Sequence, residues 1–368
     1  MIGWLAVAAA ALAGVLSLAL TPAVRSFALR VGAVDVPNAR KVHTRVMPRL
    51  GGLAIYAAFL VAAAVVVPFA EGTDFSPKVA LGLALGGAVI VFVGALDDRF
   101  GLSPKAKLLG EVAAAVVAVW IGDIRIELLN VPFGDTEIGT SFLGIPLTIL
   151  WIVGVTNAVN LIDGLDGLAA GVSAIANATI LALAALMGNE TVVLLSAALL
   201  GGTLGFLVHN FHPAKIFMGD SGALFLGFSL ATLSILGFKQ ATLVSFVVPI
   251  VILAVPLGDT FFAIVRRVLN RRPISLPDRG HLHHCLQQLG LSHRQTVVVI
   301  YGISLFFSLC ALLLSQTANW AAVIIVAVLL LAMEVGAEMI GIFSKTRRPL
   351  LRLFSRIFSW NFRPRSNK

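Results

Sequence analysis

Hydrophobic residues in this chain are grouped into long windows that short polar connections separate. A helix of about 20 apolar residues crosses about 30 Å of hydrocarbon, and such windows can be marked eleven times. They lie at 2–22, 51–70, 78–96, 106–122, 141–159, 167–187, 190–208, 221–238, 241–265, 295–316 and 320–342. The pattern predicts an all-α polytopic membrane protein with ten to eleven transmembrane helices.

One connection has a different pattern from the others. Apolar and charged residues alternate from Ile124 to Leu128, and a turn with proline and glycine follows at 132–134. Alternation with a period of two, followed by turn residues, is typical of a β-hairpin. We therefore expect a small hairpin near 124–140, with a structural role.

Basic residues are unequally divided between the two sides that the spans define. One side receives 24 of the 27 lysines and arginines, and the other side receives Lys78, Arg125 and Lys239. Because such residues accumulate on the cytoplasmic side, we expect a protein of the bacterial plasma membrane with its N-terminus outside and its C-terminus in the cytoplasm. The net charge of +9 then reflects topology and affinity for anionic headgroups, and it is no evidence for nucleic-acid binding.

Composition also indicates an integral membrane protein. Hydrophobic residues make up 58% of the sequence and charged residues only 12%, which is far from the balance of a soluble domain. We expect one integral membrane domain over 1–344. The basic tail at 345–368 is typical of a segment that lies on the inner leaflet, and it receives no chemistry.

The polar residues that remain gather on the basic side. Five loops carry them: "VDVPNARKVH", "LDDRFGLSPKAK", "TNAVNLIDGLDGLAAG", "HNFHPAKIFMGDSG" and "DRGHLHH". An ionisable group at membrane depth costs about 2.5 kcal/mol or more unless it faces a partner or a site. This convergence on one membrane face therefore favours a functional site there.

The stretch from Thr156 to Gly171 carries the strongest pattern. Asn157, Asn160, Asp163 and Asp166 recur every three residues, a spacing that keeps neighbouring side chains on one helical face. The simpler interpretation is a polar connection whose aspartates cap helices. The spacing instead favours one wall of a site.

The "LDDRFGLSPKAK" loop has signals for a helix end and a new helix start. Gly101 ends one helix, and Ser103 with Pro104 is typical of the N-cap and first position of the next. The adjacent Asp97 and Asp98 can then serve one site, although a solvated helix end would also explain them. Lys107 has Glu111 four residues later, so a simple ion pair is the alternative for that lysine.

Two other motifs have alternatives that fit less well. "GDSG" also surrounds the serine nucleophile of chymotrypsin-like proteases, but those are soluble β-barrels, and a phosphate-binding P-loop needs a different pattern. "HLHH" would suit zinc only with a closed set of four ligands, and Cys285 is the one further candidate nearby. Histidines beside arginines suit phosphate better.

Acidic side chains surrounded by lysine, arginine and histidine indicate a site for Mg²⁺ and phosphate, because Mg²⁺ takes oxygen ligands and shares its sphere with substrate phosphates. At a membrane edge, these parts favour phosphoryl transfer between a lipid phosphate and a soluble nucleotide. Ion-coupled transport is the alternative from another class, but the sequence has no visible inverted repeat. A non-catalytic scaffold would leave the five loops unexplained.

With these motifs in this order, the chain resembles the polyprenyl-phosphate N-acetylhexosamine-1-phosphate transferases of glycosyltransferase family 4. The resemblance covers nearly the whole length and also includes "PRLGG" after the first loop. It implies transfer of a sugar 1-phosphate from a UDP-sugar to undecaprenyl or decaprenyl phosphate, with release of UMP. It also implies Mg²⁺ as the cofactor, with Mn²⁺ as a substitute.

The resemblance also implies roles for individual residues. Asp97 would deprotonate the lipid phosphate, and Phe217 would stack on uracil. The implied catalytic residues are Asp97, Asp98, Lys107, Asp163, His281, His283 and His284. The implied nucleotide-binding residues are Arg45, Asn160, Asn210, Phe217 and Gly219. The implied metal ligands are Asn160, Asp163 and Asp220.

Departures from the family pattern concern the sugar. The muramoyl-pentapeptide branch has three consecutive histidines, whereas this chain has "HLHHCL", and "VDVPNARKVH" is similar to the GlcNAc branch. We therefore expect UDP-GlcNAc as donor, in the first membrane step of teichoic acid, O-antigen or a related glycan. UDP-GalNAc, a deoxy-amino sugar and UDP-MurNAc-pentapeptide remain open as donors, as does a homodimer.

Overall fold

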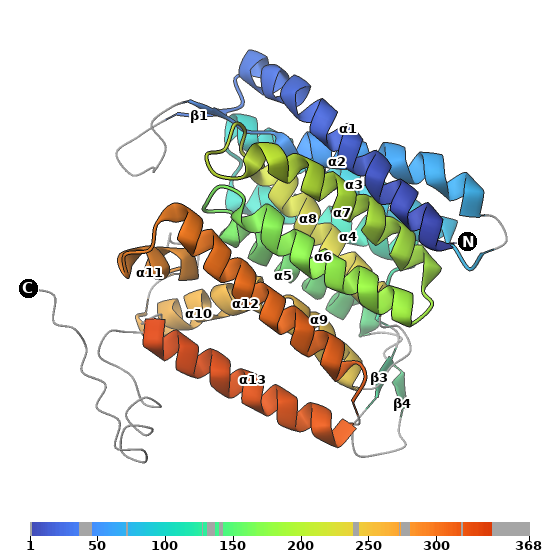
Figure 1. The fold of residues 1–368 in the computed structure, drawn as a ribbon, viewed down its shortest axis with the longest axis vertical. Coiled ribbons are helices and arrows are strands. Elements are labelled where there is room, and N and C mark those ends of the chain that lie inside the picture. Colours follow the sequence, from blue (N-terminus) through green and yellow to red (C-terminus); the bar gives the residue numbers. More distant parts are fainter. Residues whose placement is uncertain are drawn as a thin grey trace, which may run out of the picture.

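In the part of the chain that the computed structural model describes, thirteen α-helices make up most of the fold (Figure 1). The structure describes residues 2–36, 46–70, 73–126, 128–130, 137–139, 143–237, 243–271, 273, 280–317 and 319–340. The helices are α1 (Ile2–Val31), α2 (Gly51–Val66), α3 (Pro77–Phe100), α4 (Pro104–Gly122), α5 (Gly144–Ile162), α6 (Leu168–Leu186), α7 (Glu190–Asn210), α8 (Gly219–Gly237), α9 (Leu243–Ile252), α10 (Ala254–Leu269), α11 (Leu282–Gln288), α12 (His293–Leu314) and α13 (Asn319–Ile340), with a 3-10 turn (Val67–Ala70) after α2.

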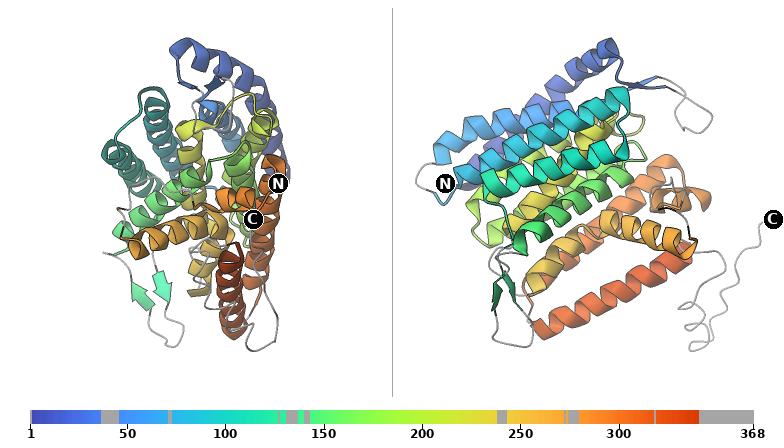
Figure 2. Two further views of the ribbon diagram at one scale, coloured as in Figure 1. Left: turned by 90° about the vertical axis from the view of Figure 1, so that its left-hand side faces the viewer. Right: turned by 180° about the vertical axis from the view of Figure 1, so that it is seen from behind.

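The centre of the bundle is α8, in which every residue except Asp220 is buried. It packs against α2, α3, α5 and α6. Figure 2 shows the bundle from the side and from behind. Small residues allow this close approach: a Cβ at Gly94 of α3 would lie 2.5 Å from the backbone of Ser221. The C-terminal half of α3 is therefore held directly against the first turn of α8.

The predicted fold class is confirmed. Among the described residues, eight helices are long and apolar enough to cross a membrane: α1, α2 with its 3-10 turn, α3, α5, α6, α7, α8 and α12. The spans predicted at 106–122 and 320–342, which correspond to α4 and α13, are not among these eight. The first two turns of α4 contain the charged Lys105, Lys107 and Glu111, and α13 contains a shorter apolar stretch, Ala321–Gly336.

The single span predicted at 241–265 is wrong, because two helices occupy it. The first, α9, ends at Ile252, and α10 begins at Ala254. Pro256 has no N–H to donate to the Ile252 carbonyl, so the regular ladder is broken there. Pro249 lies inside α9 and removes one further hydrogen bond.

The predicted hairpin near 124–140 is confirmed as β3 (Leu128–Asn130) and β4 (Glu137–Gly139), which pair antiparallel with Leu129 opposite Ile138. A second small sheet was not predicted: β1 (Val34–Asp35) pairs with β2 (Met47–Pro48). The two sheets lie at opposite ends of the bundle, with the N-terminus and β3–β4 at one end and β1 and α11 at the other (Figure 1). The bundle therefore has a hairpin end and an α11 end.

Candidate active site

Four helix ends bring polar side chains together at the α11 end of the bundle. These are the C-terminal ends of α3 and α5 and the N-terminal ends of α4 and α8. The loop between α3 and α4 folds as its sequence predicts: Gly101 is the left-handed cap of α3 with φ of 69°, and Ser103 caps α4 by accepting a hydrogen bond from the Ala106 N–H at 3.3 Å. This sharp turn places Lys107 beside Asp97.

Lys107 is the centre of an ion cluster, which we call the lysine cluster: Asp97, Lys107, Asn160 and Asp220. The Lys107 Nζ donates to Asp220 Oδ2, to Asn160 Oδ1 at 3.1 Å and to Asp97 Oδ2 at 3.5 Å. The Asn160 amide donates in turn to Asp220 Oδ1 at 3.2 Å. Residues from α3, α4, α5 and α8 thus meet within hydrogen-bonding distance.

The two adjacent aspartates have different surroundings. Asp98 is buried, and its carboxylate accepts hydrogen bonds from the backbone N–H groups of Asp220 at 2.8 Å and Ser221 at 3.1 Å. It therefore satisfies unpaired donors at the start of α8. Gly219 has φ of 71°, and a Cβ there would lie 2.7 Å from the Asp98 Oδ1. Asp97, by contrast, uses one oxygen to accept the Leu102 N–H at 2.5 Å and faces Lys107 with the other.

Asp163 follows α5 and is its C-cap. Burial, together with the negative charges of Asp220 and Asp98, raises the pKa of this carboxyl to about 7, and the Arg49 guanidinium opposes that rise. Arg49 belongs to "PRLGG" and also pairs with Asp35 at 3.6 Å; sequence reasoning assigned it no role, although the motif was visible. Two neighbouring aspartates therefore disfavour the charged form of the Asp163 carboxyl, and one arginine favours it.

The oxygen atoms near Asp163 suit a hard cation. Asp163, Asp220 and Asn160 offer carboxylate and amide oxygens, which are the ligands that Mg²⁺ prefers. Burial is the main cause of the raised pKa of Asp163, and the carboxylates of Asp220 and Asp98 add to it. The donor chemistry of these residues therefore fits the predicted Mg²⁺.

Asn157 and Asp166, the other two residues of the threefold repeat, form hydrogen bonds within the fold. The Asn157 amide donates to the carboxylate of Glu111, which is only 2% exposed, and to the Val153 carbonyl at 2.9 Å. The alternative of a simple Lys107–Glu111 pair is not what the described contacts show, because Lys107 pairs with Asp97 and Asp220.

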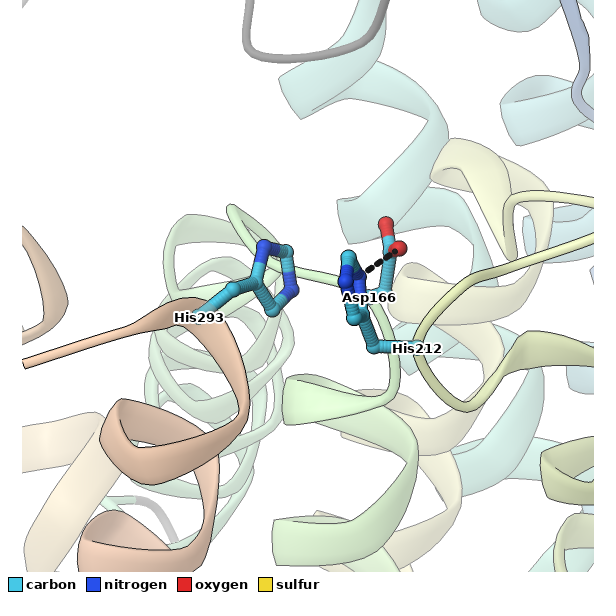
Figure 3. Close-up of side chains that lie close together, drawn as sticks. All are labelled: Asp166, His212 and His293. Carbon is cyan, nitrogen blue, oxygen red and sulfur yellow. Dashed lines mark hydrogen bonds and ion pairs between the residues drawn. The ribbon is translucent and has the colours of Figure 1, made fainter.

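Asp166 faces away from the lysine cluster. Its Oδ2 accepts hydrogen bonds from the His212 ring Nδ1 at 2.8 Å and the Ala214 N–H at 3.1 Å, and the His293 ring stacks on His212 with centroids 4.2 Å apart (Figure 3). The three side chains offer ligand atoms within 4.8 Å of one another, a spacing that could also hold a metal ion. We call these three residues the aspartate–histidine brace, because they join the α5–α6 loop, the α7–α8 loop and α12.

The described nucleotide-binding candidates have different surroundings: Asn160 belongs to the lysine cluster, and Gly219 directly precedes Asp220. Asn210 is buried and fully used, because it accepts from the Gly167 N–H at 3.1 Å and donates to the Ile216 carbonyl at 2.9 Å. Phe217 is half-buried, and its N–H donates to the Pro48 carbonyl at 2.9 Å. Arg45 lies outside the described residues.

The three predicted histidines border the site from α11. His281 is the N-cap of α11, and His283 is only 3% exposed. Burial, followed by the charge of His284, lowers the pKa of His283 to about 3. A Cβ at Gly164 would lie 2.6 Å from the His283 Nε2, so this ring lies against the residue that follows Asp163.

An apolar helical bundle with one polar end defines a polytopic membrane protein with a site at the membrane edge. The family model described as glycosyl transferase family 4 matches residues 80–238, which include the whole lysine cluster. A relative from Bacillus subtilis (strain 168), named probable undecaprenyl-phosphate N-acetylglucosaminyl 1-phosphate transferase, is 44% identical over 345 residues, 94% of each chain.

Two further relatives have names that describe the same kind of transferase. Decaprenyl-phosphate N-acetylglucosaminephosphotransferase of Mycolicibacterium smegmatis is 38% identical and covers 76% of this chain and 74% of its own. Undecaprenyl-phosphate alpha-N-acetylglucosaminyl 1-phosphate transferase of Escherichia coli (strain K12) is 32% identical and covers 75% of each chain. This chain belongs to glycosyl transferase family 4.

Proposed function

We propose that this protein transfers GlcNAc 1-phosphate from UDP-GlcNAc to undecaprenyl or decaprenyl phosphate, giving polyprenyl diphosphate GlcNAc and UMP. The names of the three relatives support the transferred group and the lipid acceptor. The observation that carries the proposal is the lysine cluster, because it gathers charges suited to phosphate at one end of an apolar bundle. A lipid phosphate can reach that end from the bilayer.

Each residue of the cluster has a role in the proposed reaction. Asp97 accepts the proton of the lipid phosphate, and a lipid phosphate oxygen then forms a bond to the β-phosphorus of UDP-GlcNAc. The bond between that phosphorus and the bridging oxygen breaks, and UMP leaves. Lys107 balances phosphate charge while the cluster holds the reacting groups in line, which is most of what phosphoryl transfer requires.

Asp220, Asn160 and Asp163 are the proposed ligands of Mg²⁺, or of Mn²⁺ in its place. The ion would neutralise charge on the diphosphate. Asp98 supports this arrangement indirectly, because its hydrogen bonds fix the first turn of α8 on which Asp220 lies.

The site is proposed to face the cytoplasm of a bacterial plasma membrane. The support is the charge distribution, since the α11 end carries Lys105, Lys107 and the arginines at the end of α10, and basic residues accumulate on the cytoplasmic side. UDP-sugars are soluble, so a cytoplasmic site can receive them directly.

The test is UMP release by purified protein with Mg²⁺, undecaprenyl phosphate and a panel of UDP-sugars. We expect release with UDP-GlcNAc that exceeds release with UDP-GalNAc and UDP-MurNAc-pentapeptide by at least about tenfold, the scale of a few lost contacts. Preference for another UDP-sugar would overturn GlcNAc as the substrate. Absence of UMP release with every donor would overturn the transferase proposal itself.

A further inference from the structure

A buried carboxylate on α10 is not used by the proposed reaction. Asp259 is 5% exposed, and both of its oxygens accept hydrogen bonds from the start of α11. Oδ2 accepts from the His281 ring Nδ1 and Oδ1 accepts from the Leu282 N–H, each at 2.8 Å. A buried carboxylate with such specific partners is costly unless they need it.

The Leu282 contact gives Asp259 one structural role. His281 is the N-cap of α11 but makes no side-chain capping bond itself, so the Asp259 carboxylate satisfies the first free N–H of that helix. This contact needs only an acceptor oxygen. An asparagine at 259 would provide that oxygen equally well.

The contact with His281 also determines which ring nitrogen of that histidine carries the hydrogen. A carboxylate cannot donate a hydrogen bond, so the ring nitrogen 2.8 Å from it must carry the hydrogen. The neutral ring is therefore held as the Nδ1–H tautomer, and its Nε2 is left as the acceptor. His281 is itself only 6% exposed, so the ring has little freedom to turn away from Asp259.

The same ring begins a row that reaches the candidate active site. The rings of His281 and His283 lie 5.9 Å apart with an angle of 4° between their planes, and those of His283 and His284 lie 4.1 Å apart. His283 lies against Gly164, the neighbour of Asp163. A change in the orientation of His281 would therefore reach the loop that holds Asp163.

We propose that Asp259 is a positioning residue, which holds His281 in the Nδ1–H tautomer and thereby orients the histidine row beside the lysine cluster. The proposal rests on the proposed transferase function. Asp259 is not a catalytic residue in this account, because it acts only through His281 and lies on the far side of that ring from Nε2.

Asp259→Asn separates the two roles. The asparagine oxygen still accepts the Leu282 N–H, but its NH₂ group then faces the His281 Nδ1 and favours the opposite tautomer. We expect kcat/KM for UDP-GlcNAc to fall about 10- to 100-fold, the usual effect of losing a partner that orients a histidine. Asp259→Ala should lose at least as much and also lower Tm. Wild-type kcat/KM in Asp259→Asn would reduce Asp259 to a helix cap and overturn the proposal.

A double-mutant cycle tests whether Asp259 acts through His281. In the His281→Ala background, Asp259→Asn should change kcat/KM less than about twofold. If Asp259→Asn lowered kcat/KM in the His281→Ala background as much as in the wild type, the proposal would be overturned. Asp123→Asn is the matched control, because this aspartate is 58% exposed near the hairpin end, where it pairs with Arg125 at 3.3 Å; it should leave kcat/KM unchanged.

A spectroscopic measurement keeps this proposal separate from the proposed function. Nitrogen NMR of ¹⁵N-histidine-labelled protein, with His281→Gln for assignment, reports which ring nitrogen of His281 carries hydrogen. We expect Nδ1 in the wild type and Nε2 in Asp259→Asn. If the wild type released no UMP but gave these tautomers, the transferase function would fail and the positioning of His281 would stand. The Nε2–H tautomer in the wild type would overturn the positioning.

Discussion

Two polar groups lie side by side at the α11 end, and they use similar residues in opposite ways. In the lysine cluster, Lys107 faces both Asp97 and Asp220, and nearby Asp163 has a raised pKa. In the aspartate–histidine brace, one oxygen of Asp166 joins two loops through His212 and Ala214. The first group concentrates charge beside Asp163, whose charged form the fold disfavours, whereas the second joins segments. A functional site is expected to have the former character.

Removal of the cluster's cation should have the largest effect. Lys107→Ala leaves Asp97 and Asp220 without their shared partner, and we expect UMP release to fall at least about 100-fold, as for loss of a charge that stabilises a transition state. Lys105→Ala is the matched control, because Lys105 is exposed and lies only two residues earlier on the same helix. A similar loss in both variants would show that general surface charge, and not the cluster, matters.

Gly219→Ala tests the backbone that connects Asp98 to the cluster. The change combines a strained positive φ with a Cβ placed against the Asp98 carboxylate, so we expect a loss of about 2 to 3 kcal/mol in stability, measured as a lower Tm. Gly188→Ala has a similar φ of 70° but open space around its Cβ, so it should lose only about 1 kcal/mol. Equal losses would mean that contact with Asp98 contributes nothing.

Exchange of the two aspartates for asparagine should separate activity from stability. Asp163→Asn removes an unfavourable, half-buried charge, so Tm measured with EDTA should stay equal or rise while UMP release is lost. Asp166→Asn weakens the brace, so Tm should fall by a few degrees, which corresponds to about 1 kcal/mol in a protein of this size. A lower Tm in Asp163→Asn than in Asp166→Asn would reverse the comparison.

The pH dependence of stability should sharpen the same contrast. The pKa of Asp163 is raised from 3.8 to about 7, so the folded state disfavours its charged form and stability is lost as pH rises from about 4 to about 7. The Tm advantage of Asp163→Asn over the wild type in EDTA should therefore grow across that window. An advantage that is constant with pH would contradict the raised pKa.

Much of this arrangement follows from local sequence signals, and the rest depends on distant contacts. Gly101, Ser103 and Pro104 fix the α3–α4 turn through local backbone preferences, so its position could be predicted. The threefold spacing from Asn157 to Asp166 predicted one wall, but α5 ends before Asp163, and Asp166 therefore turns toward His212. Spacing alone carries no information about such a partner, which is 46 residues away.

The same limit applies to the paired aspartates and to Asp259. That Asp98 accepts the N–H groups of α8 depends on the close approach at Gly94, which only packing decides. The pairing of Asp259 with His281 depends on the return of the chain from α10 to α11. The break between α9 and α10 could have been predicted from Pro256, but the apolar pattern obscured it.

The most direct test of the central account compares UMP release in two variants at opposite ends of the bundle. With UDP-GlcNAc, undecaprenyl phosphate and Mg²⁺, Asp220→Asn should lose at least about 1000-fold in rate, since it changes a residue that contacts both Lys107 and Asn160. Asp123→Asn, near the hairpin end, should retain the wild-type rate. Near-wild-type release by a folded Asp220→Asn variant would contradict a phosphoryl-transfer site at the lysine cluster.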